Sequence, residues 1–496
     1  MPERSHSANL YDFNITPELV REKLSKLHIN KACGPDGFHV NVLKNVPDFD
    51  IPLCLLFEQS LLTGFIPQDW KDANITPLFK KGSRLNPNNY RPVSLTSQVI
   101  KLLEKILYDQ LMDYITKQDL ISCHQHGFQK HCSCVTQLLE CLYDWTKDYD
   151  EKNGVDAIYL DFRKAFDTVP HGRLLYKLHH LGIRGHALNW IQSFLGSRRQ
   201  RVVLRNGSSD WRSVTSGVPQ GSILGPILFL LYVNDIPDNV YSTAKMFADD
   251  TKVYNSIKTK ADCDNLQKDL NALAAWSKAW LLEFNATKCV VLRIRSAIRY
   301  QYSLNGSFLQ EVNSQRDLGI TVNNTLTPTT HINEIVKKAR QKIAMFRRCF
   351  SRLNEEKIVT LYRAIIRPAL EYASTAWSPQ TKQNIEKLEK VQARCLRLYK
   401  SDIQLESLKE RRDRTDLIDT YKFLHGHYKT DSRKFFSSPH TNLRGHSKKL
   451  FKRRCRTHLT ANFYSHRVVD PWNKLPESTA TAPSVATFKQ RLRVLP

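Results

Sequence analysis

The stretch MFADDTKVY, residues 246–254, places two adjacent carboxylates, Asp249 and Asp250, inside a run of apolar, strand-forming residues. An ionised carboxylate is costly to bury unless a cation or a hydrogen-bond donor offsets the lost hydration. The flanking segments AKMFA and TKVY predict two strands around a tight turn, so the carboxylates would lie at the tip of a hairpin. The fold therefore has to supply a counter-charge for this pair.

A third carboxylate follows a strand earlier in the chain. The segment VDAIYLDFRKAFDTVPH begins with a predicted buried strand at 155–160, which ends at Asp161. If the hairpin lies beside this strand, Asp161 and Asp249 converge, and converging carboxylates repel each other unless divalent metal lies among them. Two Mg²⁺ ions can stabilise the attacking and leaving oxygens of an in-line phosphoryl displacement. The alternative is that each is an ordinary turn or surface aspartate.

A glycine-rich segment, SGVPQGSILGPILFLLYVND, lies between these strands at residues 216–235. Gly217, Gly221 and Gly225 allow close approach of the backbone. The segment runs into an apolar helix, whose N-terminus suits an anionic or base-stacked ligand. A plain glycine turn before a core helix is the alternative, and it explains the step from Gln220 to Gly221 poorly.

The overall composition favours a polyanionic partner. Lys and Arg outnumber Asp and Glu by 74 to 48, a formal charge of +26 over 496 residues, which favours nucleic acid before membrane. The longest apolar run, ILGPILFLLYV, is too short to span a bilayer, and the polar N-terminus is not a signal peptide. Eleven scattered cysteines indicate reduced thiols in an intracellular compartment.

One patch of cysteines and histidines, CHQHGFQKHCSC at 123–134, offers several possible zinc ligands. Its spacing matches none of the usual zinc patterns, and Cys455 with His458 are too few for a zinc knuckle. We therefore expect no zinc, and interpret the patch as a loop leading into a helix with Ser133 as its N-cap.

Three regions are expected along the chain. Residues 1–59 form an N-terminal helical extension, in which Thr16 caps a helix and Pro17 takes its first position. Residues 60–325 alternate helices with short strands, and residues 326–496 have the spacing of amphipathic helices.

Four successive motifs resemble the polymerase motifs of reverse transcriptases: LDFRKAFDTVPH, SGVPQGSILGPILFLLYVND, FADDT and NATKCVVLRI. The likeness is to the non-LTR (LINE-type, jockey or CR1-like) retrotransposon group. HINKACGPDGFHVNVLK and ITPLFKKGSRLNPNNYRPVSLTS resemble that group's extended fingers, whereas LEYASTAWSP and FYSHRVVDPWNKLP resemble its thumb and C-terminal region. The resemblance covers nearly the whole chain. It implies an α+β right-hand polymerase fold, with helical fingers, a palm of antiparallel strands, a helical thumb and a mainly helical C-terminal extension.

The resemblance also implies an activity, that of an RNA-directed DNA polymerase. Such a nucleotidyltransferase adds deoxynucleotides to a primer 3′ end by two-metal phosphoryl transfer. Its partners would be an RNA template, a DNA primer and deoxynucleoside triphosphates, its cofactors two Mg²⁺ or Mn²⁺ ions, and its compartment the nucleus. Such elements usually carry an N-terminal endonuclease, and we expect that domain to be absent, as in a truncated copy.

The expected metal ligands follow from the same resemblance. The catalytic aspartates are Asp161, Asp249 and Asp250, and Asp161 with Asp249 would bind both metals directly. Asp250 would point at them less directly, and the backbone carbonyl of Phe162 would complete the coordination of one ion.

The expected nucleotide-binding residues also follow from the matched motifs. Arg91 and either Lys80 or Lys81, in the fingers, would bind the triphosphate. Gln220 and Gly221 would line the nascent base pair, and the ring of Phe166 would lie beneath the sugar. Lys288 would act as a general acid near the pyrophosphate. The alternatives are solvated surface charge for Lys80 or Lys81 and a core aromatic for Phe166.

Two basic clusters after residue 325 are candidate contacts to nucleic acid. VKKARQKIAMFRR at 336–348 carries six basic residues and no acid, on a helix whose other face is apolar, and RGHSKKLFKRRCRTH at 444–458 carries seven more. The expected contacts are Lys337, Lys338, Arg340, Arg347, Arg348, Lys448, Lys449, Lys452, Arg453 and Arg454. A solvated helix face is the alternative. If the tail is a clamp, deletion from about residue 430 should spare single-nucleotide addition.

Two rival classes share some of these features. A binding protein with an inactive polymerase fold would explain the charge, but it would not need acids that repel phosphate. A group II intron maturase or a telomerase-type polymerase would share the FADDT hairpin, whereas WNKLP and GFIPQDWKDANITPLFKKG favour the retrotransposon enzyme.

Overall fold

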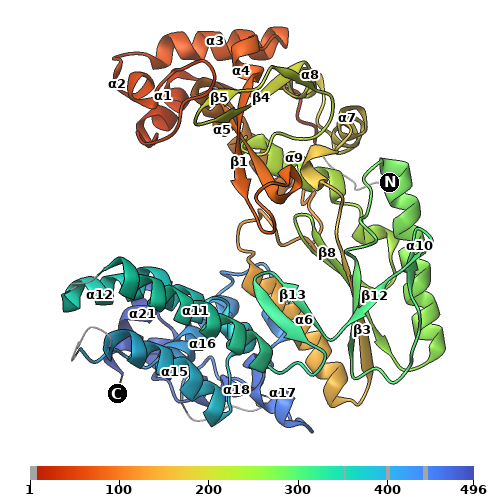
Figure 1. Cartoon of the computed structure of the whole chain (residues 1–496), viewed down its shortest axis with the longest axis vertical. Coiled ribbons are helices and arrows are strands. Elements are labelled where there is room, and N and C mark those ends of the chain that lie inside the picture. Colours follow the sequence, from red (N-terminus) through yellow and green to blue (C-terminus); the bar gives the residue numbers. More distant parts are fainter. Residues whose placement is uncertain (1–7, 351–353, 398–402, 440–444, 496) are drawn as a thin grey trace. The chain divides into compact units, whose positions relative to one another are not determined.

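The computed structural model describes residues 8–350, 354–397, 403–439 and 445–495, which form two compact units (Figure 1). Unit 1 comprises Met1–Phe128, Asp161–Tyr241 and Asp269–Ala286. Unit 2 comprises Gln129–Leu160, Ser242–Lys268 and Thr287–Pro496. The three consecutive domains expected from the sequence are a different division of the chain and stay a prediction.

Unit 1 combines helices with a mixed five-stranded sheet. The strands are β1 (Ala73–Phe79), β2 (Tyr90–Thr96), β4 (Arg198–Leu204), β5 (Gly207–Ser208) and β6 (Arg212–Val214). The helices are α1 (Pro17–Ser25), α2 (Val40–Asn45), α3 (Asp50–Thr63), α4 (Gln68–Lys71), α5 (Gln98–Lys117), α7 (His171–His180), α8 (Gly185–Leu195) and α9 (Leu224–Val233). β1 pairs antiparallel with β2 and parallel with β4. The helices expected for the fingers are therefore accompanied by a sheet in this part of the chain.

The β1–β2 hairpin was not indicated by the sequence. Its two prolines, Pro77 and Pro92, lie directly opposite each other in the register. Proline donates no ladder hydrogen bond, so its presence argues against a strand when the sequence is considered one segment at a time. Pairing of the remaining residues of both strands overrides that local signal.

Local signals at two helix starts are confirmed. The Thr16 hydroxyl accepts a hydrogen bond from the Leu19 N–H at 3.3 Å, at the start of α1. Ser133 caps α6 (Cys134–Asp150) in a reciprocal capping box with Thr136. A capping hydroxyl satisfies one of the N–H groups that a helix start leaves unpaired.

Unit 2 contains a second five-stranded sheet, in the order β12-β9-β3-β8-β7. Its strands are β3 (Gly154–Leu160), β7 (Thr243–Phe247), β8 (Asp250–Ile257), β9 (Val290–Ile294) and β12 (Gln310–Val312). The predicted palm strand and hairpin are confirmed, and β3 pairs antiparallel with both β8 and β9. The expected all-antiparallel sheet is wrong at one edge, because β12 runs parallel to β9.

The remaining elements of unit 2 are mainly helical. They are the small strands β10 (Ser303–Leu304), β11 (Ser307–Phe308), β13 (Ser314–Asp317) and β14 (Ile320–Asn323), and the helices α11 (Thr329–Cys349), α12 (Glu355–Leu361), α13 (Arg367–Glu371), α14 (Ser374–Trp377), α15 (Lys382–Arg397), α16 (Leu408–Leu424), α17 (His458–Asn462), α18 (Tyr464–Arg467), α19 (Val469–Asn473), α20 (Glu477–Ala480) and α21 (Val485–Val494). Helix α10 (Lys260–Trp280) passes from unit 2 to unit 1. No helix in the described ranges is both long and apolar enough to cross a membrane.

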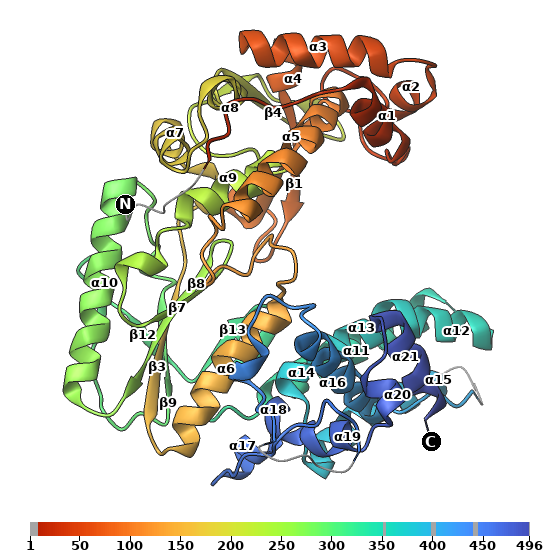
Figure 2. The ribbon, with the colours of Figure 1, turned by 180° about the vertical axis from the view of Figure 1, so that it is seen from behind.

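One hydrophobic core runs through unit 2, from the sheet to the last helix. Helix α6 packs on β3 and on α14 and α17, and α11, α15 and α16 lie side by side (Figure 2). The same cluster of buried residues contains Leu138 of α6, Leu292 of β9, Val391 of α15 and Phe488 of α21. The C-terminal region is therefore continuous with the core that supports the sheet.

Candidate functional site

The hairpin of β7 and β8 presents the two adjacent aspartates at its tip. Phe247 pairs with Asp250, and the turn between them consists of Ala248 and Asp249. Met246 and Thr251 on either side are buried, but Asp249 and Asp250 are both exposed. The two carboxylates thus lie at the tip of the hairpin, as the sequence predicts. Exposed carboxylates keep their hydration, so no large desolvation cost has to be offset here.

Asp161 directly follows the strand that lies next to this hairpin in the sheet. Leu160, the last residue of β3, pairs with Thr251, the residue that follows Asp250. The Asp161 carbonyl accepts a hydrogen bond from the Asn285 N–H at 2.7 Å. The antiparallel register thus brings the end of β3 beside the start of β8, as the sequence predicts.

The backbone of Phe162 is oriented by the segment that follows α10. Phe162 forms an antiparallel bridge with Phe284, and the neighbouring Arg163 N–H donates to the Glu283 carbonyl at 2.8 Å. Successive residues of an antiparallel pair direct their polar groups to opposite sides. The Phe162 carbonyl therefore points away from the segment around Phe284, while the two rings stack at 4.5 Å between centroids.

The lysines of the hairpin strands are engaged with acids inside unit 2. Lys252 of β8 forms a buried ion pair with Asp317, which also accepts the Tyr159 hydroxyl at 3.1 Å. Burial acts to lower the pKa of Lys252, but the charge and hydrogen bond of Asp317, with Cys141 and Asp250 nearby, together outweigh it and the net shift is upward. Lys245 of β7 pairs with Glu140 of α6. These lysines secure the hairpin to the rest of unit 2.

The donor chemistry at this end of the sheet suits a hard divalent cation. The candidate ligands are the carboxylates of Asp249 and Asp250 in unit 2, and the Asp161 carboxylate and Phe162 carbonyl in unit 1. All are oxygens, which Mg²⁺ prefers. Across the described parts of the chain, no group of three His, Cys, Asp or Glu side chains is gathered closely enough to hold a metal ion. The residue types therefore fit the ion, but the described side chains are not gathered around a common point.

The glycine-rich segment forms an irregular loop in unit 1 that is tied to β2. The Ser94 N–H donates to the Gln220 carbonyl at 2.7 Å. Gly221 has φ +128°, and a Cβ on it would lie 2.4 Å from the Ser94 carbonyl oxygen. The close approach that the sequence predicts for this glycine is confirmed, and its neighbour is another strand of the protein.

The start of α9 is occupied by a side chain of the protein itself. Glu104 of α5 is fully buried, and its Oε2 accepts the N–H groups of Ile223 at 2.6 Å and Leu224 at 3.0 Å. A carboxylate satisfies both the unpaired N–H groups and the positive end of the helix dipole. Two of the N–H groups that an anionic ligand would use at this N-terminus are therefore already bonded within the protein.

Phe166 lies in a short 3-10 turn, Ala165–Asp167, and is partly buried. Its ring stacks on Phe229 of α9, with 4.3 Å between centroids and 20° between planes. Its carbonyl accepts the Val218 N–H at 2.7 Å. One face of the ring is therefore supported by the core, an arrangement compatible with both interpretations of this residue.

The predicted cations of unit 1 lie around the tip of the β1–β2 hairpin. Lys80, Lys81 and Arg91 are exposed, and Arg91 lies opposite Leu78 in the register. The backbone N–H of Lys80 donates to the Asn89 carbonyl at 2.8 Å, which fixes the backbone but not the side chain. In unit 2, Lys288 is exposed in the turn before β9.

Of the two basic clusters, only the one on α11 forms a regular face. Its cations are exposed, whereas the residues on the opposite side of the helix are buried in the core; the exposed cations are Lys337, Lys338, Arg340, Arg347 and Arg348.

The C-terminal cluster is partly engaged inside unit 2. Lys452 pairs with Asp470, and Arg453 donates to the Tyr143 hydroxyl at 2.6 Å. Lys448 and Arg454 are exposed and Lys449 is partly buried, while Arg444 lies outside the described residues.

Two carboxylates next to the glycine-rich loop were missed by sequence reasoning. Glu104 contacts the start of α9, and Asp167 accepts the Gln220 side-chain amide at 2.8 Å. Glu104 falls on the buried, mainly apolar face of helix α5. A charged residue on an apolar face is the signal that could have identified it.

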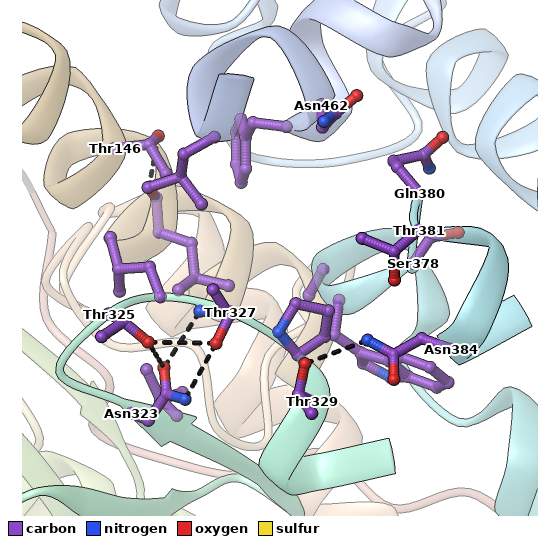
Figure 3. A pocket seen from close by; sticks show the side chains of 18 of the residues that line it. Thr146, Asn323, Thr325, Thr327, Thr329, Ser378, Gln380, Thr381, Asn384 and Asn462 are labelled. Carbon is purple, nitrogen blue, oxygen red and sulfur yellow. Dashed lines mark hydrogen bonds between the residues drawn. The ribbon is translucent and has the colours of Figure 1, made fainter. Parts of the chain in front are cut away.

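A cavity of about 360 Å³ lies in unit 2, away from every residue predicted for the site. Its wall is made mainly by polar and apolar side chains from α6, β14, the start of α11, the α14–α15 connection and α17, together with Arg467 at the end of α18 (Figure 3). On the wall, Asn323 bonds to Thr327 at 3.1 Å and Asn384 bonds to Thr329 at 3.0 Å. These polar groups are thus already used within the protein.

Comparisons with known proteins agree with these motifs. Residues 79–322 match the family "Reverse transcriptase (RNA-dependent DNA polymerase)". The "Probable RNA-directed DNA polymerase from transposon BS" of Drosophila melanogaster is 30% identical over 404 residues, which cover 77% of this chain and 44% of that protein. The "RNA-directed DNA polymerase from mobile element jockey" of the same species is 29% identical over 399 residues, 77% of this chain and 43% of that protein.

More distant relatives belong to the same kind of element. The "Retrovirus-related Pol polyprotein from type-1 retrotransposable element R1" of Bradysia coprophila is 25% identical over 381 residues, 72% of this chain and 36% of that protein. The chain thus spans less than half the length of the curated relatives it matches. With the ordered motifs and the family match together, residues 79–322 belong to the reverse transcriptase family, and 77% of the chain is similar to RNA-directed DNA polymerases of non-LTR retrotransposons.

Proposed function

We propose that this chain catalyses RNA-directed DNA synthesis, adding deoxynucleotides to a primer 3′ end by in-line phosphoryl transfer with two divalent metal ions. The observation that carries the proposal is the β3–β8 register, in which Leu160 pairs with Thr251. Asp161 follows the first of these residues, and Asp249 and Asp250 precede the second. In this proposal the three carboxylates and the Phe162 carbonyl hold Mg²⁺ or Mn²⁺, which would neutralise charge on the reacting phosphate.

The chain's own residues would bind and orient the nucleotide. The exposed cations of the β1–β2 hairpin, Lys80 or Lys81 with Arg91, would hold the triphosphate. Gln220 and Gly221 would line the nascent base pair. Lys288 would protonate the leaving pyrophosphate as a general acid.

The RNA template and DNA primer would be held by cations of unit 2. The exposed face of α11 is the best candidate, because its five exposed lysines and arginines have no acid among them while the opposite face is fixed in the core. Phosphate contacts of this kind give affinity without sequence preference. The C-terminal cluster contributes to a smaller extent in this proposal, since Lys452 and Arg453 already bond within unit 2.

The test is primer extension on a primed RNA template, with Mg²⁺ present or removed by chelation. We expect extension by the wild-type chain with Mg²⁺, and its loss in Asp161→Ala and Asp249→Ala. Primer-template binding, measured by fluorescence anisotropy, should be unchanged or slightly tighter in both variants, because each removes a charge that repels phosphate. Asp210→Ala, at an exposed aspartate outside the motifs, is the matched control and should extend normally.

Two outcomes would contradict the proposal. Substantial extension by Asp249→Ala would exclude the carboxylate-held metal mechanism. Tight binding of the primer-template by the wild-type chain without any extension would favour the binding protein with an inactive polymerase fold.

A further inference from the structure

The loop at 216–221 has no regular secondary structure, yet its base is fixed by buried groups of unit 1. Gly217 is buried, Gln220 is partly buried and Gly221 is exposed, so the loop turns its Gln-Gly end toward solvent. A loop that must present one side chain in one orientation needs anchors that do not themselves move. Two carboxylates that no motif identified supply such anchors.

The first anchor, Asp167, sets the orientation of the Gln220 amide. The Gln220 Nε2 donates to the Asp167 Oδ1 at 2.8 Å. An ionised carboxylate can only accept, so the amide must turn its NH₂ group toward Asp167. That leaves the Gln220 Oε1 as the atom available to accept a hydrogen bond from a ligand.

Asp167 is in turn held by the first part of the same loop. Its carbonyl accepts the Ser216 hydroxyl at 3.0 Å, and its own N–H donates to the Lys164 carbonyl at 2.8 Å. The backbone of Gly217 lies so close that an added Cβ would be 2.6 Å from the Asp167 carbonyl oxygen. The turn and the loop therefore form one packed block.

The second anchor, Glu104, fixes the chain on the other side of Gln220. Its Oε2 binds the N–H groups of Ile223 and Leu224, two and three residues after Gly221 in α9's first turn. Burial raises the pKa of Glu104, and the two N–H groups and the charge of buried Arg198 act in the opposite direction. Together with the bond from Ser94 to the Gln220 carbonyl, these contacts hold Gln220 from three elements.

We propose that Asp167 and Glu104 are positioning residues that fix Gln220 for contact with the incoming nucleotide, Asp167 through the side-chain amide and Glu104 through the backbone. The inference rests on the proposed function, in which Gln220 lines the nascent base pair. It assigns roles to two residues that touch neither metal nor nucleotide.

The experiment measures KM and kcat for single-nucleotide addition on a primed RNA template. Gln220→Ala should raise KM for the correct deoxynucleotide, and Asp167→Ala should raise it by a similar factor, roughly tenfold, with kcat changed less. Asp167→Asn keeps an acceptor oxygen for the Gln220 amide and should restore KM to within about threefold of wild type. The double variant Asp167→Ala/Gln220→Ala should have the same KM as Gln220→Ala, because both changes remove the same hydrogen bond.

Glu104 is tested in the same assay with two variants. Glu104→Ala removes both hydrogen bonds and should raise KM. Glu104→Gln keeps an acceptor oxygen, so its KM should lie between those of Glu104→Ala and the wild type. Glu104→Gln also keeps the experiment informative if Glu104→Ala fails to fold. Asp269→Ala is the matched control, because Asp269 is equally buried and accepts the Tyr241 N–H at 2.9 Å elsewhere in the fold. It should lower Tm without raising KM.

The outcomes separate the inference from the proposed function. If Gln220→Ala leaves KM unchanged, the assigned role of Gln220 is wrong. If Gln220→Ala raises KM while Asp167→Ala and Glu104→Gln only lower Tm, as Asp269→Ala should, the positioning inference is overturned. Additive effects in the double variant would overturn it as well.

Discussion

Gly221 shows at the scale of one residue why the loop tolerates no side chain. Its φ of +128° is open mainly to glycine, and a Cβ would meet the Ser94 carbonyl oxygen at 2.4 Å. The Ser94 N–H also donates to the carbonyl of Gln220, the residue before Gly221. A side chain here would therefore push the Gln220 backbone away from β2.

We predict that Gly221→Ala lowers primer extension more than it lowers stability. The added methyl group would break the bond between Ser94 and Gln220, while the core of α9 stays packed. Steady-state extension and a thermal melt of the same preparation measure the two effects. Gly207→Ala is the control, since nothing lies within 4 Å of its Cβ position, and a loss of activity equal to that of Gly221→Ala would contradict the prediction.

Phe166 is the residue proposed to select the sugar. A ring packed against C2′ leaves no room for a 2′-hydroxyl, so the wrong substrate is rejected by a clash. The stacking on Phe229 holds the ring from below at 4.3 Å, which would stiffen such a gate. The same contact is what a core aromatic would make.

Phe166→Val distinguishes these two roles. A gate predicts a large rise in ribonucleotide incorporation with a modest loss of deoxynucleotide activity. A core residue predicts a loss of stability with the deoxy-to-ribo ratio unchanged, because the stack on Phe229 would be lost without any change at the sugar. Competition between the two nucleotides in one extension reaction gives the ratio directly.

Helix α11 carries a basic face opposite an apolar one. Six basic residues occur in 336–348, and the apolar face packs Ile335, Ala339, Ile343 and Phe346 into the core. The polar face is thereby fixed in orientation as a surface of positive charge. Such a surface either binds phosphate or is simply solvated.

We predict that reversing Lys337, Lys338 and Arg340 to glutamate flattens the salt dependence of RNA binding. Each phosphate contact contributes roughly 0.7–0.9 to the log–log slope. Fluorescence anisotropy titrations at several salt concentrations give that slope. Reversing Lys26, Lys117 and Lys390, exposed lysines already paired with acids, is the matched control. An unchanged slope in the α11 variant means that this face is only solvated.

The start of the same helix carries a pH-sensitive contact. His331 is buried, its Nδ1 accepts the Thr321 N–H at 3.2 Å, and burial lowers its pKa from 6.5 to about 4. The unfolded chain therefore takes up a proton at higher pH than the folded chain does. Stability from this residue is complete above pH 6.5 and is lost as the pH falls toward 4.

We expect the preference of His331 for the unprotonated form in the fold to lower the unfolding free energy of unit 2 by about 2 kcal/mol when the pH falls from 7.5 to 5. Urea unfolding at the two pH values measures this loss. In His331→Gln the loss should be smaller by the same amount, because glutamine does not titrate in this range. Equal losses of stability in the variant and the wild type would contradict a pKa lowered by burial of His331.

On the scale of the whole molecule, the C-terminal region belongs to the core of unit 2. Trp472 and Phe488 are fully buried, and the Tyr421 hydroxyl of α16 bonds to the Ala482 carbonyl. This packing argues against the expectation that residues beyond about 430 form a separable clamp. Removing them would expose the apolar face of α16 to water.

We predict that deletion from residue 430 abolishes folding of unit 2 rather than only lowering processivity. Point variants give a graded version of the same test. Phe488→Ala should cost about 3–5 kcal/mol, as expected for a buried aromatic residue. Val494→Ala, on the same helix but 81% exposed, should cost little. A soluble, cooperatively melting 1–429 chain that still adds one nucleotide would contradict this prediction.

Local sequence patterns determined much of the molecule. The caps at Thr16 and Ser133, the strand before Asp161 and the hairpin around Asp249 were all predictable, because each is specified by residues within a few positions of one another. The order of the four polymerase motifs likewise identified the family. These features depend on chain neighbours, which the sequence displays directly.

Only the tertiary structure decided which distant groups meet. The parallel pairing of β1 with β4 and the capping of α9 by Glu104 each depend on residues far apart in the sequence. Glu104 and Leu224 are separated by 120 positions, and no local period records such a pair. The sequence thus determined the chemistry available to this protein, whereas long-range packing determined which carboxylates are left for solvent and which are used to hold the loop.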